Sequence, residues 1–266
     1  MEKMIKLYTN TTKEKARFLA ERIAEEAISV GYGIIDSLSK EKIKPDIVIG
    51  LGGDGTLLNY LQENDYKTTA KYIGVNCGTL GFLQDFEIDD VKDFINNIPN
   101  YIEQKINFVS LDINEGQNKF NALNEFSIQN ENDKAFRTSL YIDDKHLEDF
   151  VGTGLIFSTP TGSTARNLSS VGCIVHPDIE ALQITPREAI VNNKMHSLAK
   201  SICIPKSLQI TLYPANSDMI KIYSDGKCVY TGFYSKINIH YSYDYIIKLT
   251  DTKNSFIKKV REKLIV

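Results

Sequence analysis

Cysteine is scarce in this sequence of 266 residues, and the four present, Cys77, Cys173, Cys203 and Cys228, lie far apart without a C-x-x-C pair. This spacing argues against a zinc site and against a disulfide framework, and reduced thiols in a cytoplasm are the simpler interpretation. The chain also lacks an apolar run that approaches a membrane span, and residues 1–6 lack the apolar core of a signal peptide. We therefore expect a soluble, cytoplasmic protein with no membrane partner.

An excess of charge of one sign is missing as well. The formal net charge is −3, and no long block of basic residues occurs. Proteins that bind nucleic acids usually carry a dominant basic face, so we expect no nucleic-acid partner. The length and the ordinary apolar content allow a substantial core in one large domain or in two ordinary ones.

The first hundred residues alternate between strand and helix patterns. Apolar, strand-like segments at 5–8, 46–51 and 72–76 are separated by helical spacing over 12–30, from 56 onward and from 89 to about 99. Such alternation is typical of a mostly parallel sheet joined by right-handed crossovers. We predict an α/β domain over residues 1–100.

After residue 100 the pattern changes to short apolar segments separated by turn residues. The strand candidates are 106–113, 120–128, 138–142, 147–158, 208–213, 219–223, 228–234 and 236–240. We predict a mainly β domain over residues 101–245. The remaining segment, 246–266, is expected to form a tail helix that packs back on the first domain.

The segment Gly52–Thr56 has the sequence Gly-Gly-Asp-Gly-Thr and lies between an apolar strand and a predicted helix. Glycines let the backbone approach a ligand, and the first N–H groups of a helix attract anions, so this turn is suited to phosphate. Asp54 would be repelled by bound phosphates, which suggests that it binds a metal or accepts a proton. The turn is not a Walker loop and lacks the G-x-G-x-x-G spacing.

Three other polar segments interrupt the apolar pattern. Residues 158–166 (Ser-Thr-Pro-Thr-Gly-Ser-Thr-Ala-Arg) offer hydroxyls to a ribose, a phosphate or a base edge, and a plain turn with a helix cap is an equally good interpretation. Asn124-Glu125 is an edge position or a ligand site, and on its own the structural interpretation is favoured. Asp225-Gly226 indicates a hairpin turn, and His176 is expected to be a packed loop histidine.

Taken together and in this order, these segments resemble the NAD kinase family, in particular its bacterial members that use ATP or polyphosphate. The resemblance covers nearly the whole chain, including residues 76–82, 152–166, 176–177, 192–193, 225–226 and 256–261. Gly-Gly-Asp-Gly-Thr alone also occurs in diacylglycerol and sphingosine kinases. The segment 159–165, Thr-Pro-Thr-Gly-Ser-Thr-Ala, favours the NAD kinases.

The resemblance implies transfer of the γ-phosphoryl group of ATP, or of polyphosphate, to the 2′-hydroxyl of the adenosine ribose of NAD, which gives NADP. It implies Mg²⁺ or another divalent metal bound with ATP, and a homodimer or homotetramer. We assign no residue of the protein as a metal ligand. Asp54 would be the base. Asn124 would bind the adenine and Glu125 a ribose, with Ser169 and Ala189 near the nicotinamide end. The full set of implied substrate-binding residues is Gly52, Gly53, Gly55, Thr56, Phe82, Asn124, Glu125, Thr153, Thr161, Thr164, Ala165, Arg166, Ser169 and Ala189.

Three positions depart from the family pattern. Thr153 stands where members usually have the aspartate of Gly-Asp-Gly, Val151 where bacterial members often have arginine, and Arg166 where tyrosine is usual. Loss of both partners of an ion pair leaves no unpaired buried charge, so the first two changes look coupled. We hypothesise that the preference for NAD or NADH as acceptor differs from that of the ordinary enzyme. A non-catalytic dinucleotide-binding regulator and a lipid kinase remain as alternatives.

Overall fold

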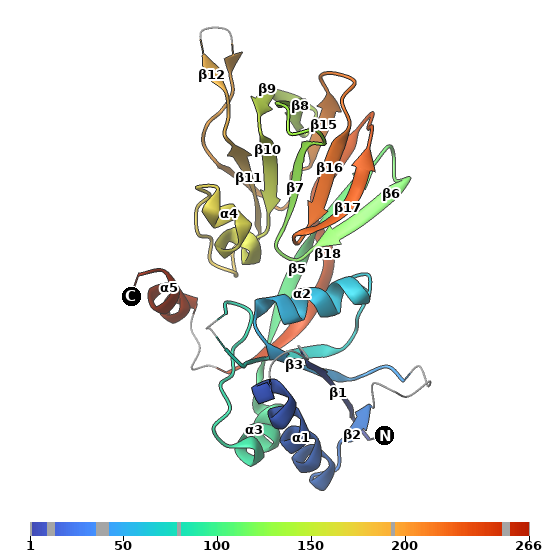
Figure 1. The fold of residues 1–266 in the computed structure, drawn as a ribbon, viewed down its shortest axis with the longest axis vertical. Helices are drawn as coiled ribbons and strands as arrows, with labels where there is room; N and C mark the ends of the chain where they lie inside the picture. The colour runs from blue at the N-terminus through green and yellow to red at the C-terminus, as the bar shows by residue number, and fades with distance from the viewer. Residues whose placement is uncertain are drawn as a thin grey trace. The chain divides into compact units, whose positions relative to one another are not determined.

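The computed structural model describes residues 2–9, 14–35, 43–78, 81–192, 195–251 and 256–265. The chain divides into two compact units, which Figure 1 shows as a ribbon. Unit 1 comprises Met1–Ile106 together with Ile246–Val266, and unit 2 comprises Asn107–Tyr245. Of the helices in the described parts of the chain, none is both long and apolar enough to cross a membrane.

Unit 1 is built on a parallel sheet. Its strands, in spatial order, are β2 (Gly33–Ile35), β1 (Met4–Thr9), β3 (Ile47–Gly52), β4 (Lys71–Asn76) and the last part of β18 (Ile237–Thr250). Every neighbouring pair is parallel. All residues of β3 are buried, as expected for a central parallel strand covered on both faces.

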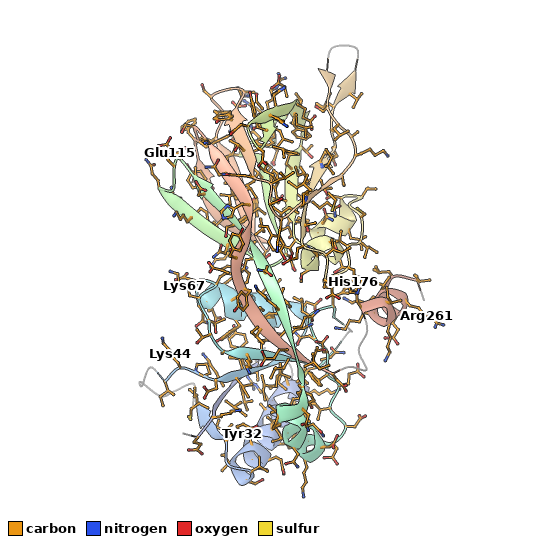
Figure 2. All side chains as sticks on the ribbon, turned by 180° about the vertical axis from the view of Figure 1, so that it is seen from behind. Tyr32, Lys44, Lys67, Glu115, His176 and Arg261 are labelled. Carbon is orange, nitrogen blue, oxygen red and sulfur yellow. The ribbon has the colours of Figure 1, made fainter. Side chains whose placement is uncertain are left out.

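Unit 1 also contains four α-helices among the described residues: α1 (Glu14–Ser29), α2 (Asp54–Glu63), α3 (Val91–Asn97) and α5 (Phe256–Leu264). A 3₁₀ turn, η1 (Ile98–Asn100), follows α3. Helix α1 buries Ala16, Leu19, Ile23 and Ala27, whose spacing places them on one face. These side chains join the sheet and α3 in one core, against which Tyr32 packs (Figure 2). Helix α2 begins at Asp54, two residues earlier than predicted, so Asp54 belongs to its first turn.

Unit 2 consists of antiparallel strands in two sheets. In one sheet β18, β15 (Ile210–Pro214), β8 (Phe136–Ile142) and β9 (Lys145–Gly152) are neighbours, and β5 (Ile102–Ile113) pairs with β6 (Asn118–Ala122). The other sheet has the order β14 (Ile202–Pro205), β11 (Ala181–Arg187), β10 (Gly154–Ser158), β7 (Glu125–Asn130), β16 (Ile220–Ser224) and β17 (Lys227–Gly232). A short pair, β12 (Val191–Asn192) and β13 (Met195–His196), lies apart from both.

The predicted fold class is confirmed: an α/β region with a parallel sheet is joined to a mainly β region. The apolar faces of the strands of unit 2 form its core, which includes Phe126, Phe136, Phe150 and Phe157. Glu115 lies at the tip of the β5–β6 hairpin (Figure 2). The strands β11 and β14 were not among the predicted segments.

Two predicted strands are wrong because each is split between the two sheets. The segment 120–128 forms β6 and β7, and the segment 147–158 forms β9 and β10. The first break is held by Asp225, whose carboxylate accepts hydrogen bonds from the N–H groups of Leu123 (2.7 Å), Asn124 (2.7 Å) and Glu125 (3.1 Å). The second break lies at Thr153, whose N–H donates to Arg187 O on β11 instead of continuing β9.

The predicted hairpin turn at Asp225-Gly226 is confirmed. It joins β16 to β17 with Ser224 opposite Lys227, and both turn residues have positive φ, 46° and 85°. This geometry matches type I′ turns, which favour Asp-Gly for that reason. Asp225 therefore both forms the turn and holds the break between β6 and β7.

We predict that Asp225→Ala lowers the free energy of unfolding by about 3 kcal/mol, because three backbone N–H groups lose a charged acceptor. Asp225→Asn keeps one acceptor oxygen and tolerates positive φ, so it should lose clearly less. Urea unfolding measures both. Lys227→Ala, an exposed position on the same hairpin, serves as the control and should change stability by no more than about 0.5 kcal/mol. Equal midpoints for Asp225→Ala and Lys227→Ala would contradict the proposed role of the carboxylate.

Candidate functional site

Asp54 is the first residue of α2 and follows β3 directly. Its Oδ2 accepts a hydrogen bond from the N–H of Phe82 at 2.8 Å, and its Oδ1 accepts one from the N–H of Leu83 at 2.9 Å. These two bonds fix the plane of the carboxylate. Since 30% of the side chain remains exposed, the carboxylate is oriented but still accessible to a reacting hydroxyl.

The glycines around Asp54 fall into two groups. A Cβ atom at Gly81 would lie 2.0 Å from Asp54 Oδ1, so the position of the Asp54 carboxylate requires glycine there. A Cβ at Gly52 would lie 2.1 Å from Thr56 Oγ1, so the Thr56 hydroxyl would have to turn away. A Cβ at Gly53 or Gly55 would meet none of the described atoms within 4 Å, and neither residue has positive φ. The protein itself does not require glycine at 53 and 55, and the open space beside them is suited to a ligand.

This open space lies at the N-terminus of α2. Gly53 is the N-cap residue, and no side chain of the described residues caps the helix by a hydrogen bond. Uncapped N–H groups at a helix N-terminus bind anions, aided by the helix dipole. Phosphate binding at this turn stays a prediction, and the open, uncapped helix N-terminus is compatible with it.

Helix α5 places a cation beside Asp54. Lys263 Nζ lies 3.9 Å from Asp54 Oδ2 and 4.8 Å from the centre of the Phe82 ring. The Phe82 ring also contacts Phe256 of α5, and the two ring centres are 6.1 Å apart. The sequence predicted the helix but assigned no role to Lys263. Lys263 follows Lys259 by four residues, so both lysines lie on one face of α5. This spacing is the sequence feature from which a role for Lys263 could have been predicted.

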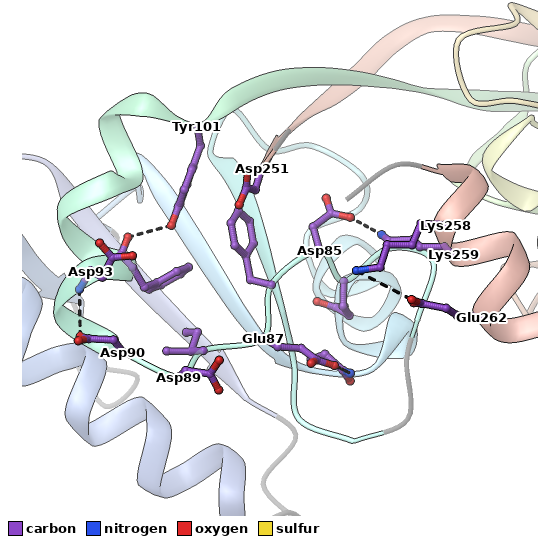
Figure 3. A pocket seen from close by; sticks show the side chains of 15 residues that line it. Asp85, Glu87, Asp89, Asp90, Asp93, Tyr101, Asp251, Lys258, Lys259 and Glu262 are labelled. Atoms are coloured by element: carbon purple, nitrogen blue, oxygen red, sulfur yellow. Dashed lines mark hydrogen bonds and ion pairs between the residues drawn. The ribbon is translucent and has the colours of Figure 1, made fainter. Parts of the chain in front are cut away.

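A cavity of about 620 Å³ in unit 1 is not the candidate site. Its lining includes the carboxylates of Asp85, Glu87, Asp89, Asp90 and Asp93 (Figure 3), and Asp54 is not among the described residues that line it. Among the described residues, seven carboxylate side chains line the cavity against two lysines, Lys258 and Lys259, so its net charge is negative and repels phosphate groups. The cavity therefore does not suit a triphosphate or a dinucleotide.

In unit 2, Glu125 is a buried carboxyl group at the start of β7. Only 4% of it is exposed, and its Oε2 has no hydrogen-bond partner in the described part of the chain. Burial is the largest cause that raises the pKa of Glu125 to about 8; the charge of Asp225 acts in the same direction and that of Arg166 opposes it. A buried polar atom without a partner is costly and is satisfied when a ligand supplies one.

The segment 158–166 packs directly against Asn124. The N–H of Thr159 donates to Asn124 O at 2.9 Å, and Thr159 Oγ1 donates to Leu123 O at 2.6 Å. A Cβ at Gly162 would lie 2.0 Å from Asn124 O, so only glycine fits there. The segment forms a 3₁₀ turn, η2 (Thr161–Thr164), followed by the short helix α4 (Arg166–Ser169), and it brings two of the predicted segments together.

The three positions that depart from the family pattern are accommodated without strain. Val151 is buried, and its N–H donates to Ser197 Oγ at 2.9 Å. The Thr153 hydroxyl donates to Arg187 O at 3.2 Å. The guanidinium carbon of Arg166 lies 5.8 Å from the centre of the Tyr223 ring, an arrangement that orients the side chain by a cation–π contact.

The remaining predicted residues are less informative. Ala189 is partly buried against the core of unit 2, and Ser169 ends α4. His176 is exposed, so the prediction of a packed histidine is wrong; its Nδ1 accepts the N–H of Asp178 at 3.3 Å. Within the segments 76–82 and 192–193, residues 79, 80 and 193 lie outside the described residues.

The comparisons with known proteins cover both units. The family model described as the ATP-NAD kinase N-terminal domain matches residues 6–105, and the one described as the ATP-NAD kinase C-terminal domain matches residues 123–249. The chain is 29% identical over 259 residues to an NAD kinase of Finegoldia magna, covering 91% of this chain and 94% of the relative. It is 35% identical over 188 residues to an NAD kinase of Staphylococcus aureus, covering 68% and 70%.

Two solved structures share the fold. A yeast NADH kinase in complex with NADH matches with a TM-score of 0.85 and 19% identity, covering 99% of this chain and 87% of that one. An NAD kinase from Archaeoglobus fulgidus in complex with ATP matches with a TM-score of 0.77 and 21% identity, covering 98% and 99%. The fold and the matched domains define an ATP-dependent kinase built from an N-terminal and a C-terminal domain. The chain belongs to the NAD kinase family.

The raised pKa of Glu125 predicts a pH dependence of stability. Because the pKa rises from 4.5 to about 8 on folding, the folded protein keeps a proton that the unfolded chain releases, and stability falls as the pH rises through this interval. Glu125→Gln cannot ionise. Its free energy of unfolding relative to the unmodified protein should therefore increase by up to about 1.4 kcal/mol per pH unit between about pH 5 and pH 8.

Urea unfolding at several pH values measures this difference. Glu115→Gln, at an exposed hairpin tip, is the matched control and should show no such trend. A constant difference for Glu125→Gln across the interval would show that this carboxyl group titrates normally.

Proposed function

We propose that this protein transfers the γ-phosphoryl group of ATP to the 2′-hydroxyl of the adenosine ribose of NAD and so produces NADP. The observation that carries the proposal is the Asp54 carboxylate, oriented by the N–H groups of Phe82 and Leu83 and still partly exposed. It lies in a chain of the NAD kinase family, at the N-terminus of a helix beside two glycines with open space. The family assignment disfavours a lipid kinase.

Asp54 acts in this proposal as the general base. A carboxylate within hydrogen-bond reach of the ribose hydroxyl takes its proton as the oxygen attacks phosphorus. Phosphoryl transfer depends mainly on positioning and on neutralising charge, not on covalent chemistry by the protein. Lys263, beside Asp54, and the N–H groups at the start of α2 supply positive charge for the phosphates.

The residues of unit 2 bind the dinucleotide in this proposal. Asn124 pairs with the adenine, and the unpartnered Oε2 of Glu125 bonds to a ribose hydroxyl, which satisfies a buried polar atom. With a pKa near 8, the Glu125 carboxyl is mostly protonated at neutral pH and can donate as well as accept. The other assigned residues, Thr161, Thr164, Ala165, Ser169 and Ala189, follow the family pattern.

The departures from that pattern set the acceptor preference. Loss of an aspartate at Thr153 and of an arginine at Val151 cancels in charge, whereas Arg166 in place of tyrosine adds one positive charge. The nicotinamide ring of NAD is cationic and that of NADH is neutral. An added cation in the acceptor-binding unit therefore disfavours NAD relative to NADH.

A divalent cation, Mg²⁺ in the simplest case, enters with ATP and neutralises charge on the transferring phosphates. The proposal assigns no metal ligand in the protein, and no group of three or more His, Cys, Asp or Glu side chains that could hold a metal occurs among the described residues. Polyphosphate as a second donor, a homodimer or homotetramer, and a cytoplasmic location are proposed from the family resemblance.

The central test is NADP formation from NAD, ATP and Mg²⁺. We expect Asp54→Asn to lower kcat by about 10²- to 10⁴-fold, because the amide cannot accept the proton. Glu63→Gln, which removes a carboxylate at the other end of α2, is the matched control and should retain activity. Full activity of Asp54→Asn would remove this residue from the role of base. A folded but inactive unmodified protein would favour the non-catalytic regulator.

The acceptor preference is tested with Arg166→Tyr. Removing the added charge should raise the ratio of kcat/KM for NAD to that for NADH by about 2- to 20-fold, the range given by one charge near 10 Å at effective dielectric constants of 80 to 20. Lys119→Gln removes one exposed charge from unit 2 and should leave the ratio unchanged. An unchanged ratio in Arg166→Tyr would separate this residue from acceptor choice.

A further inference from the structure

Helix α5 carries a buried lysine, Lys259, that contacts Phe82, one of the two residues whose N–H groups donate to Asp54. Only 7% of the Lys259 side chain is exposed. Its Nζ donates to Phe82 O at 2.8 Å and forms an ion pair with Asp85. Figure 3 shows the Asp85 carboxylate and Lys259 side by side on the wall of the acidic cavity.

One peptide group connects Lys259 to Asp54. The carbonyl of Phe82 accepts from Lys259, and the N–H of the same peptide group, on Leu83, donates to Asp54 Oδ1 at 2.9 Å. A charge-assisted bond to a carbonyl polarises the peptide and strengthens the bond that its N–H makes. The ammonium of Lys259 thus acts on the Asp54 carboxylate across a single peptide.

The buried ion cluster contains two lysines, Lys248 and Lys259, and one carboxylate, that of Asp85. Asp85, whose side chain is 2% exposed, pairs with Lys248 at 2.8 Å as well as with Lys259. Burial raises the pKa of Asp85, but the two lysines outweigh it and hold that pKa below its usual value. Burial lowers the pKa of Lys259, and the charge of Asp85 opposes this. Lys248 alone would neutralise Asp85, so the pairing with Asp85 does not by itself account for the second buried lysine, whose Nζ also donates to Phe82 O.

We propose that Lys259 is a positioning residue for phosphoryl transfer: it fixes the Phe82–Leu83 peptide and thereby orients the Asp54 carboxylate. Asp85 keeps Lys259 buried and charged beside this peptide. The role rests on the proposed NAD kinase activity. It makes the C-terminal helix part of the catalytic machinery and not only a cover for the sheet.

The two lysines of the cluster provide a matched pair of variants. Lys259→Met and Lys248→Met each leave Asp85 with one lysine, so neither leaves a buried carboxylate unpaired. Only Lys259→Met removes the bond to Phe82 O. A purely structural role of the cluster predicts similar losses in both variants, whereas a positioning role predicts different ones.

The experiment measures kcat, KM for NAD and for ATP, and urea unfolding in the full-length protein. We expect Lys259→Met to lower kcat by about 10- to 100-fold, the loss typical of a reacting group displaced by about 1 Å, while KM changes little. Lys248→Met should lose comparable stability but keep kcat within about threefold. Lys259→Arg, which can donate to Phe82 O and Asp85 together, should restore most of kcat.

Two results would overturn the proposal: an unchanged kcat in Lys259→Met, or equal losses of kcat in Lys259→Met and Lys248→Met. If Lys259→Met does not fold, Lys259→Gln decides, since its shorter and neutral side chain lacks the charge-assisted bond to Phe82 O that fixes the peptide. A lowered kcat with an unchanged KM would then support the role, and the kcat of the unmodified protein would exclude it. If the unmodified protein makes no NADP, the proposed function itself fails, which is a distinct outcome.

Discussion

The Asp54 carboxylate and the two N–H groups that it accepts form the interaction on which unit 1 depends. The bonds to Phe82 and Leu83 hold the segment that follows β4 against the first turn of α2. Close approach at Gly81 makes this possible, because any side chain there would occupy the position of the Asp54 oxygen. The same bonds orient the carboxylate that we propose as the general base, so in this proposal local stability and function depend on one contact.

Unit 2 uses a carboxylate in the same way with a different consequence. Asp225 accepts three N–H groups at residues 123–125 and so fixes the break between β6 and β7. Its negative charge also lies near Glu125 and helps to raise the pKa of that buried carboxyl group. Backbone donors leave one of these aspartates partly exposed, whereas the other is enclosed by them, and its charge adds to the effect of burial in raising the pKa of its neighbour.

The fold class could be predicted from the sequence because the alternation of strands and helices, and later of strands and turns, is a local pattern. The break at Leu123-Asn124 could not: the polar pair Asn124-Glu125 interrupts the apolar pattern there but does not indicate a change of sheet, and the cause of the break, Asp225, lies a hundred residues further along the chain. The same limit applies to the site. Gly52–Thr56 and 158–166 are conspicuous in composition, whereas Asp85, Lys259 and Lys263 are ordinary charged residues until the fold places them beside Phe82 and Asp54.

The departures at Val151, Thr153 and Arg166 are informative because the structure satisfies each of them locally. Val151 takes a buried place that an unpaired arginine could occupy only at high cost, and the Thr153 hydroxyl bonds to Arg187 O where a carboxylate would be repelled by that oxygen. Arg166 rests on the Tyr223 ring and lowers the cost of ionising Glu125. Charge has thus been removed from one strand end and added at α4, beside the buried carboxyl group. A change of this kind leaves Asp54 and its donors untouched, which is why we propose that it bears on which acceptor is bound and not on how the phosphoryl group is transferred.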